Sequence, residues 1–311
     1  MLPLEAGDYV RAAEAVRAGF LAAAEAAGAK DRIVVIAHGD SDVTVAFEKA
    51  RAAGAQVVVG PLVRDHLRTL AASNVTLPWT IALNQLDDGA PLPLRVYTLA
   101  LAIESDARVI ARRARDDGVT TVAIIGAESP LMKRFAFAFA GEWLLVGGSA
   151  PLSFKLDPTP DGLAALRREL GKTPFDAVVI AAEGADTALV KSFTPRVIAY
   201  ASAQVDPRQS AATARDLDDV RLVDLPWLVT PDAPEFAKWP RRDYPSAALE
   251  RLYALGLDAF LVANTFADGA PERLDLNGAT GRLTLTEGRQ VAREGRLGVF
   301  RGGRLVPVDP R

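Results

Sequence analysis

No cysteine occurs among the 311 residues of the chain. This absence excludes disulfides, thiol catalysis and cysteine-ligated zinc, and it leaves the redox compartment open. Histidine is nearly as scarce. The two histidines, His38 and His66, lack the i, i+4 spacing of a helical metal pair. We therefore expect neither a metal site nor a cofactor.

The chain also lacks an excess of charge of one sign. The 36 lysines and arginines face 39 aspartates and glutamates, which gives a formal net charge of −3. This balance offers no electrostatic attraction for nucleic acid, and no polybasic run points to a membrane surface. No uncharged apolar stretch reaches membrane-spanning length. We expect no nucleic-acid partner.

The first residues, MLPLEAGDY, lack the charged and apolar regions of a targeting signal. Any targeting segment is therefore expected to have been removed or never present. Leu2-Pro3-Leu4 resembles the end of a strand whose beginning is missing.

The loops of three common enzyme classes are missing as well: G-x-G-x-x-G, the P-loop and G-x-S-x-G. No nucleophile, base and orienting residue form a recognisable set. We expect a non-enzymatic protein without catalytic residues. The alternative, a cell-wall hydrolase, would use Asp40, Glu128 or Glu183.

What the chain does contain is a regular alternation of strand and helix patterns. Short β-branched runs without polar alternation indicate parallel strands that are covered on both faces, and helical stripes separate them. Such alternation predicts an α/β fold with parallel sheets. The strands expected before residue 220 are 32–37, 56–59, 79–83, 121–125, 152–156, 176–181 and 196–200, and the helices are 9–27, 43–53, 63–73, 104–117, 130–145, 160–170 and 185–191. Beyond it we expect an extended segment at 221–229, a helix at 244–266 and antiparallel hairpins at 280–308.

Two segments follow neighbouring predicted strands in the first half of the chain. Pro61-Leu62 comes after the strand at 56–59, and Asn84-Gln85 comes after the strand at 79–83. Ligands of open parallel sheets bind outside the carboxyl ends of the strands. Pro61, Leu62, Asn84 and Gln85 are therefore candidate ligand-binding residues.

Three further candidates follow strands of the second half. Glu128, Ser129 and Glu183 would face a cleft between two lobes, or would equally lie in the first turn of a helix, where a carboxylate suits the helix dipole. Trp227, in a segment expected to cross between lobes, is a candidate for lining the same cleft, since clefts between lobes commonly hold small ligands.

His38 lies beside Asp40, Ser41 and Asp42. This grouping could serve acid–base or cation chemistry. A Ser or Asp directly before a predicted helix more often accepts a hydrogen bond from the first turn, so the spacing favours Ser41 or Asp42 as a helix cap.

The order of motifs resembles a known family. The stretches LPLEAGDYVRAAEAVRAGFLAA, GPLVRDHLRTLA with IALNQ, and GATGRLTLTEGRQVARE are similar to the LppC-type lipoproteins, which have the type I periplasmic-binding-protein fold. The resemblance covers essentially the whole chain. It implies two Rossmann-like lobes around a cleft, 1–96 with 226–278 and 97–225 with 279–311, joined by three crossings near 95–103, 222–230 and 270–282.

The resemblance also implies a role. It suggests a non-enzymatic periplasmic outer-membrane lipoprotein that regulates peptidoglycan synthesis through a bifunctional penicillin-binding protein, the peptidoglycan synthase. The family's lipid-bearing cysteine and N-terminal helical-repeat domain are absent from these 311 residues, so membrane attachment would depend on an anchor outside them. The alternative is an ABC-transporter-type solute receptor for a small amino-acid-like or peptide-like ligand. Amino-acid-binding relatives place small hydroxyl residues where this chain has Leu62-Val63, which weakens that reading.

Overall fold

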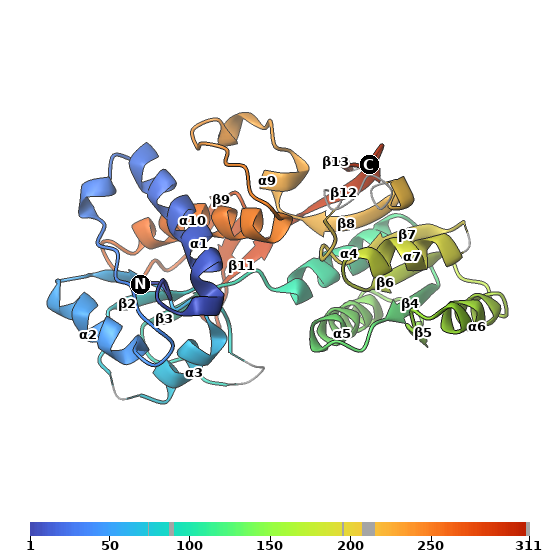
Figure 1. Cartoon of the computed structure of the whole chain (residues 1–311), viewed down its shortest axis with the longest axis horizontal. Coiled ribbons are helices and arrows are strands. Elements are labelled where there is room, and N and C mark those ends of the chain that lie inside the picture. Colours follow the sequence, from blue (N-terminus) through green and yellow to red (C-terminus); the bar gives the residue numbers. More distant parts are fainter. Residues whose placement is uncertain (74, 87–89, 195, 207–214, 309–311) are drawn as a thin grey trace. The chain divides into compact units, whose positions relative to one another are not determined.

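The chain forms two compact α/β units (Figure 1). The computed structural model describes residues 1–73, 75–86, 90–194, 196–206 and 215–308. Unit 1 comprises Met1–Leu101 and Pro231–Arg293, and unit 2 comprises Ala102–Thr230 and Glu294–Arg311. Each unit contains one sheet with a run of parallel strands, which confirms the predicted fold class.

The chain passes between the units three times, and two of these passages fall at or beside the predicted positions. The third lies after Arg293, whereas the resemblance implied 270–282. The difference arises because residues 282–294 extend the sheet of unit 1. The unit bounds therefore differ from the lobe bounds that the sequence suggested.

Unit 1 has a six-stranded sheet in the order β1-β2-β3-β11-β10-β9. Strands β1, β2, β3 and β11 run parallel, and β9 pairs antiparallel with β10. The strands are β1 (Val57–Val59), β2 (Trp79–Ala82), β3 (Val96–Leu99), β9 (Asp275–Asn277), β10 (Arg282–Leu285) and β11 (Gln290–Glu294). The helices of four residues or more are α1 (Val10–Ala26), α2 (Val43–Ala52), α3 (Arg64–Ala71) and α10 (Ala247–Thr265).

Apolar side chains of β1 reach both faces of this sheet. Val57 and Val59 pack into the cluster that contains α1 and α10, and Val58 packs into the cluster that contains α2 and α3. A short run of three valines can therefore stay apolar throughout, as expected for a strand covered on both faces.

Helices α1 and α10 cross closely, and Figure 1 shows them side by side. A Cβ atom on Gly19 would lie 1.9 Å from the Tyr253 carbonyl oxygen, and one on Gly256 would lie 2.1 Å from the Val16 carbonyl oxygen. These positions require glycine because the opposing atoms belong to helix backbones, which cannot rotate away as a side chain can.

The predicted strand at 32–37 is not formed, which is a correction to the sequence analysis. Residues 30–32 form a 3-10 turn, and the segment makes one isolated parallel bridge, between Leu2 and Ala37. Val34 and Val35 remain 66% and 42% exposed. The composition favours a strand, but a strand also needs a hydrogen-bonding partner along its edge, and this segment lacks one over most of its length.

A buried carboxylate ties α10 to the loop that precedes β10. Asp258 is fully buried and accepts hydrogen bonds from the backbone N–H groups of Ala279 (2.6 Å) and Thr280 (2.7 Å) and from the Thr280 hydroxyl. Desolvation by burial raises the pKa of Asp258 to about 6, and the hydrogen bonds oppose that change. The contacts fix residues 278–280 against the helix.

Unit 2 has a seven-stranded sheet in the order β13-β12-β8-β7-β6-β4-β5. The five strands from β5 to β8 are parallel, and β12 runs antiparallel to both of its neighbours. The strands are β4 (Val122–Gly126), β5 (Leu152–Lys155), β6 (Ala177–Ala181), β7 (Ile198–Ala201), β8 (Val220–Asp224), β12 (Arg296–Arg301) and β13 (Arg304–Pro307). The helices within the described ranges of this unit include α4 (Ile103–Asp116), α5 (Pro130–Leu145), α6 (Pro160–Leu170), α7 (Ala185–Phe193) and α9 (Pro226–Val229).

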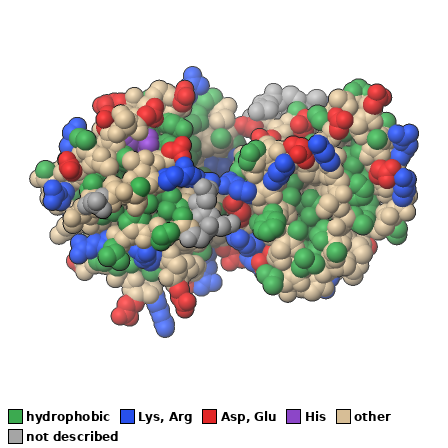
Figure 2. All heavy atoms as spheres, turned by 90° about the horizontal axis from the view of Figure 1, so that it is seen from below, with side chains coloured by type: hydrophobic (Ala, Val, Ile, Leu, Met, Phe, Trp, Pro, Cys, Tyr) green, Lys and Arg blue, Asp and Glu red, His purple; other side chains and the backbone are tan. Residues whose placement is uncertain are grey.

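Two hydrophobic clusters cover the two faces of this sheet. Val122 and Ile124 of β4 pack with α4 and α5, and Ala123 and Ile125 pack with α6 and α7. The alternation follows from the two-residue period of a strand. Figure 2 shows positive and negative side chains mixed on the viewed face of each unit. No helix within the described ranges has the length and apolarity to span a membrane.

The close crossing predicts opposite effects for two glycine substitutions. Gly256→Ala should lower the free energy of unfolding by about 2 kcal/mol, because overpacking against the Val16 carbonyl outweighs the better helix propensity of alanine. Gly141→Ala, at an exposed position of α5 where an added Cβ meets no atom within 4 Å, should raise it by about 0.5–1 kcal/mol. Denaturant titration measures both, and equal stabilisation by the two variants would contradict the crossing.

Asp258 predicts a pH dependence of stability. Its folded pKa of about 6 lies above the ordinary value of 3.8, so the folded state binds more protons between these pH values. Stability from this group is therefore full below pH 4 and falls as the pH rises to 6, by about 3 kcal/mol. The difference in unfolding free energy between the chain and its Asp258→Asn variant, measured from pH 4 to 7, isolates this effect. A difference that stayed constant or grew with pH would refute it.

Candidate functional site

The carboxyl ends of β1 and β2 in unit 1 are linked by hydrogen bonds. Gly60 N–H donates to the Ile81 carbonyl (2.8 Å), and Leu83 N–H donates to the Pro61 carbonyl (2.8 Å). The structure thus brings Pro61 and Leu62 next to Asn84, because β1 and β2 are parallel neighbours in the sheet. Leu62 is buried, at 8% exposure, which leaves little of its side chain for a ligand.

Asn84 uses its side chain to hold this edge together. Its Nδ2 donates to the Leu62 carbonyl (3.0 Å), and its Oδ1 accepts from the Gln85 backbone N–H (2.9 Å). The side-chain amide therefore uses one donor and one acceptor in hydrogen bonds within the protein. Gln85 lines a small cavity of about 340 Å³ with Thr98 and Arg289, both of unit 1. At this edge Asn84 is a structural link, and Gln85 has the freer side chain.

Two buried histidines lie at the same edge of unit 1. The His38 and His66 ring centroids are 5.1 Å apart, and both side chains are almost fully buried. His38 Nδ1 lies 2.7 Å from the Gly39 carbonyl, while His66 Nε2 lies 3.7 Å from Asp40 Oδ1. Burial lowers the pKa of His38, an effect that the Gly39 carbonyl opposes. The geometry describes a desolvated histidine pair beside one exposed carboxylate.

The sequence spacing of the two histidines does not reveal this pairing, because the rings come from separate segments rather than from one helix. The available signal was that each histidine follows a β-strand pattern within the same alternating unit, where successive carboxyl ends meet. The expected cap at 43–53 is also not formed as predicted. Asp42 occupies the N-cap position without a side-chain cap bond, and the Ser41 hydroxyl lies 3.4 Å from the Asp42 carboxylate. No group of three or more potential metal ligands occurs among the residues that the structure describes.

In unit 2 the structure brings Ser129 and Glu183 together. Ser129 caps α5 by accepting a hydrogen bond from Met132 N–H (3.3 Å), and its hydroxyl donates to Glu183 Oε1 (2.6 Å). These two residues follow β4 and β6, which are neighbours in the sheet. Ser129 is therefore engaged as a cap and a link, which matches the helix-start alternative of the sequence analysis.

Glu128 points instead toward two lysines. Its carboxylate lies 3.0 Å from Lys133 Nζ and 3.9 Å from Lys155 Nζ. The hydrogen bond and charge of Lys133, followed by the charge of Lys155, lower the pKa of the exposed Glu128 carboxyl. An ionised carboxylate cannot act as a general acid near neutral pH.

Trp227 does not line an open site in unit 2. It lies in the short helix α9, is 1% exposed and belongs to the core of the unit. The extended segment predicted at 221–229 ends at Asp224, because Pro226 at the first helical position begins α9. The tryptophan consequently faces protein on all sides.

Each unit contains one sheet, and the chain passes between the two units three times. Together these features define a module with the type I periplasmic-binding-protein fold. Its structure is similar to the C-domain of LpoA from Haemophilus influenzae, described as a regulator of PBP1A, with a TM-score of 0.80 and 22% identity over 99% of this chain and 98% of that one. It is also similar to a structure described as a putative branched-chain amino acid ABC transporter from Chromobacterium violaceum ATCC 12472. That match has a TM-score of 0.81 and 32% identity, and covers 96% of this chain and 97% of the other.

The chain belongs to the family described as "LppC putative lipoprotein", whose model matches residues 1–154 and 162–303. This membership confirms the resemblance found in the sequence. Among curated relatives, the penicillin-binding protein activator LpoA of Enterobacter sp. (strain 638) is 27% identical over 82% of this chain and 42% of its own length. The protein of the same name from Escherichia coli (strain K12) is 26% identical over 82% of this chain and 44% of its own. The chain thus spans less than half the length of these relatives.

The hydrogen bonds at the strand ends of unit 1 predict that two neighbouring substitutions lower the free energy of unfolding by different amounts. Asn84→Ala should lower the free energy of unfolding by about 1–3 kcal/mol, because the half-buried Leu62 carbonyl and Gln85 N–H lose their partner. Gln85→Ala, the matched control, should change it by no more than about 0.5 kcal/mol. Denaturant unfolding of both variants is the measurement. Equal effects would show that Asn84 does not link the strand ends.

Proposed function

We propose that the chain is the binding-protein-like module of a penicillin-binding protein activator. In this role it is a non-enzymatic part of a periplasmic outer-membrane lipoprotein, and it regulates peptidoglycan synthesis by binding a bifunctional penicillin-binding protein. The observation that carries the proposal is the family match over nearly the whole chain, together with relatives that are named activators. The described residues supply the module, and a lipid anchor would lie outside them.

The geometry of the two strand-end edges supports a role without catalysis. In unit 1, Leu62 is buried and Asn84 is bonded to backbone groups. In unit 2, Ser129 is a helix cap and Glu128 is held ionised by lysines. The polar side chains at these two edges are therefore largely engaged with other groups of the protein, which fits a protein that works through its outer surface.

A second candidate function is a solute receptor of an ABC importer. The 32% identity to a structure described as a putative branched-chain amino acid ABC transporter favours it. An amino-acid ligand needs donors for its carboxylate and acceptors for its ammonium group. The apolar pair Leu62-Val63 supplies neither through its side chains. This candidate therefore ranks second.

The activator role predicts an effect on a synthase. The purified chain, added to the bifunctional penicillin-binding protein of the same organism with lipid-linked substrate, should bind it and raise the rate of peptide cross-linking several-fold. Sedimentation of the mixture measures binding, and separation of muropeptides measures cross-linking. A solute receptor of the same fold from outside the family serves as the control. Absence of both association and rate change would contradict the proposal.

The receptor candidate is separated by a thermal-unfolding screen with amino acids and short peptides. A true ligand at one hundred times its Kd adds about 2.7 kcal/mol of stability. If one amino acid raises the unfolding temperature in this way, and the chain does not change the cross-linking rate of the synthase, the receptor role replaces the activator role. No shift across the screen, with synthase activation present, supports the activator.

A further inference from the structure

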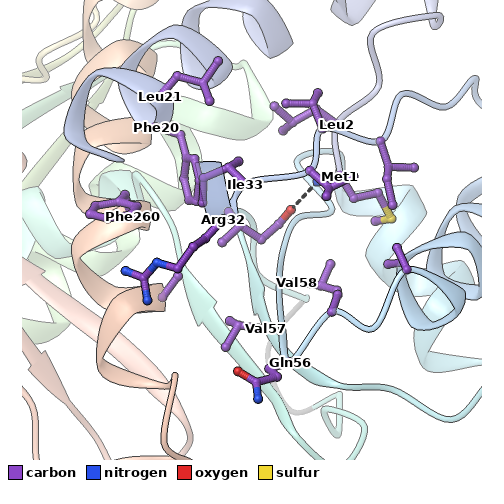
Figure 3. A pocket seen from close by; sticks show the side chains of 18 of the residues that line it. Met1, Leu2, Phe20, Leu21, Arg32, Ile33, Gln56, Val57, Val58 and Phe260 are labelled. Atoms are coloured by element: carbon purple, nitrogen blue, oxygen red, sulfur yellow. Dashed lines mark hydrogen bonds between the residues drawn. The ribbon is translucent and has the colours of Figure 1, made fainter. Parts of the chain in front are cut away.

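A groove in unit 1 lies between helix α1 and residues 238–249, and it has a volume of about 740 Å³. Its α1 side extends over the whole helix, from residue 10 to residue 26. A smaller cavity of about 330 Å³ lies beside the same helix, and there Phe20 and Phe260 contact each other edge to face (Figure 3). Leu21, labelled in Figure 3, belongs to both linings. The larger groove differs from the smaller cavity in its charge.

Positive side chains outnumber negative ones around the groove. Five basic residues line it against two acidic ones: Arg11, Arg17, Lys30, Lys238 and Arg242 against Glu14 and Glu25. Glu14 is already paired with Arg17 (2.6 Å). Glu25 is likewise paired with Lys30 (3.3 Å). Among the residues that the structure describes, Arg11, Lys238 and Arg242 form no ion pair with a carboxylate. Five cations less the two that are paired leave three that are free to attract an anion.

Aromatic rings position two of these three cations. Lys238 Nζ lies 4.5 Å from the centre of the Trp239 ring. The guanidinium carbon of Arg242 lies 5.9 Å from the centre of the Tyr253 ring. The Tyr253 hydroxyl donates to the Pro240 carbonyl (2.7 Å), which holds this loop against α10. A ring attracts a cation through its quadrupole and carries no net charge. The contacts therefore hold the two cations in place and do not neutralise them.

The rest of the lining is mostly apolar. Small and aliphatic side chains of α1 lie on one side, and prolines, a tyrosine and a leucine lie on the other: Ala15, Ala18, Leu21 and Ala22 with Pro240, Tyr244, Pro245 and Leu249. The small side chains of α1 keep the groove open. An occupant would therefore meet apolar surface between the charged groups, and both kinds of contact would contribute to its binding.

The length of the groove favours an extended occupant. Helix α1 has 17 residues, and a helix rises 1.5 Å per residue, so the groove follows it for about 25 Å. Arg11 lies in the first turn of α1, whereas Lys238 and Arg242 come from the opposite side. A strand of about seven residues spans this length at about 3.3 Å per residue, and its side chains alternate between two faces. Acidic side chains on one face can then reach the cations while apolar ones on the other contact the lining.

We propose that the groove binds an extended acidic peptide segment of a partner protein, about seven residues long, in which acidic and apolar side chains alternate. Recognition of acidic motifs by clustered arginines is a recurring mode of peptide binding. The lining includes none of the candidate residues at the carboxyl ends of the strands, so this site is separate from them. The proposal rests on the proposed function only for the source of the segment, which would belong to the synthase.

The test measures the binding of fluorescent peptides to the whole chain by anisotropy. The probe Glu-Leu-Glu-Leu-Glu-Leu-Glu should bind. Matched peptides with glutamine or lysine in place of glutamate should bind at least about tenfold more weakly, because they lack the complementary charge. Binding of the acidic probe should also weaken several-fold between about 50 and 300 mM salt, since the cations are exposed and salt screens them.

Substitution of the three unpaired cations locates the binding. The triple variant Arg11→Gln, Lys238→Gln and Arg242→Gln should bind the acidic probe about tenfold more weakly at low salt. The charge-retaining variant Arg11→Lys, Lys238→Arg and Arg242→Lys should bind it within about threefold of the unaltered chain. In the control, Lys49→Gln removes an exposed lysine of α2 that does not line the groove, and binding should not change. The midpoint of thermal unfolding checks that all variants fold.

Three outcomes would overturn the proposal. Equal binding of the acidic and glutamine peptides would show that charge does not select the occupant. Equal binding of the acidic probe by the triple variant and the Lys49→Gln control would place the binding elsewhere. If inorganic phosphate or vesicles of phosphatidylglycerol bound through the three cations while the peptide did not, the groove would recognise a free anion or a lipid surface.

The synthase assay separates this proposal from the proposed function. A chain that activates the synthase but does not bind the acidic probe would contradict the groove proposal alone. A chain that binds the probe through the three cations but neither binds nor activates the synthase would contradict the proposed function alone. If both proposals hold, the triple variant should bind the synthase several-fold more weakly than the Lys49→Gln control does.

Discussion

The contact on which unit 1 depends is the close crossing of α1 with α10. Glycines at positions 19 and 256 allow the two helix backbones to approach to distances that no side chain would fit. The two helices come from opposite parts of the sequence, so this contact joins the first hundred residues to the segment that returns after unit 2. Asp258 on α10 then holds Thr280, and through it the hairpin whose last strand, β11, pairs with β3. One helix thereby positions the outer half of the sheet.

Hydrogen bonds within the protein also occupy the polar side chains at the strand ends, where ligands of this fold are commonly bound. Asn84 links β2 to the segment after β1, and Ser129 links the start of α5 to Glu183 after β6. Polar side chains at these places are occupied with one another and with the backbone. The protein retains the binding-protein architecture, while many polar side chains at its strand ends make contacts that stabilise the fold. This arrangement fits the regulatory role proposed above.

Much of the fold could be read from the sequence, because strands covered on both faces leave unbroken apolar runs and helices leave stripes. The same patterns also predicted a strand at residues 32–37 that does not form. The segment has the composition of a strand, but strand pairing depends on which segment lies beside it, and composition does not record that. The site was harder. That Asn84 bonds to the Leu62 carbonyl, and that His38 meets His66, are consequences of the register between separate strands. Trp227 was misjudged because Pro226 was taken as a break in an extended segment, whereas it opens a helix that buries the ring.

The discontinuity of unit 1 has a consequence for how the protein is made. Helix α1 leaves the ribosome about 240 residues before its partner α10. At synthesis rates of about 5–20 residues per second, the apolar stripe of α1 waits roughly 10 to 50 seconds before it can be covered. During that interval unit 2 also lacks its last two strands, β12 and β13. Neither unit can therefore finish folding until the segment from α10 to β13 has been synthesised, and the apolar stripe of α1 stays uncovered on the nascent chain until α10 emerges.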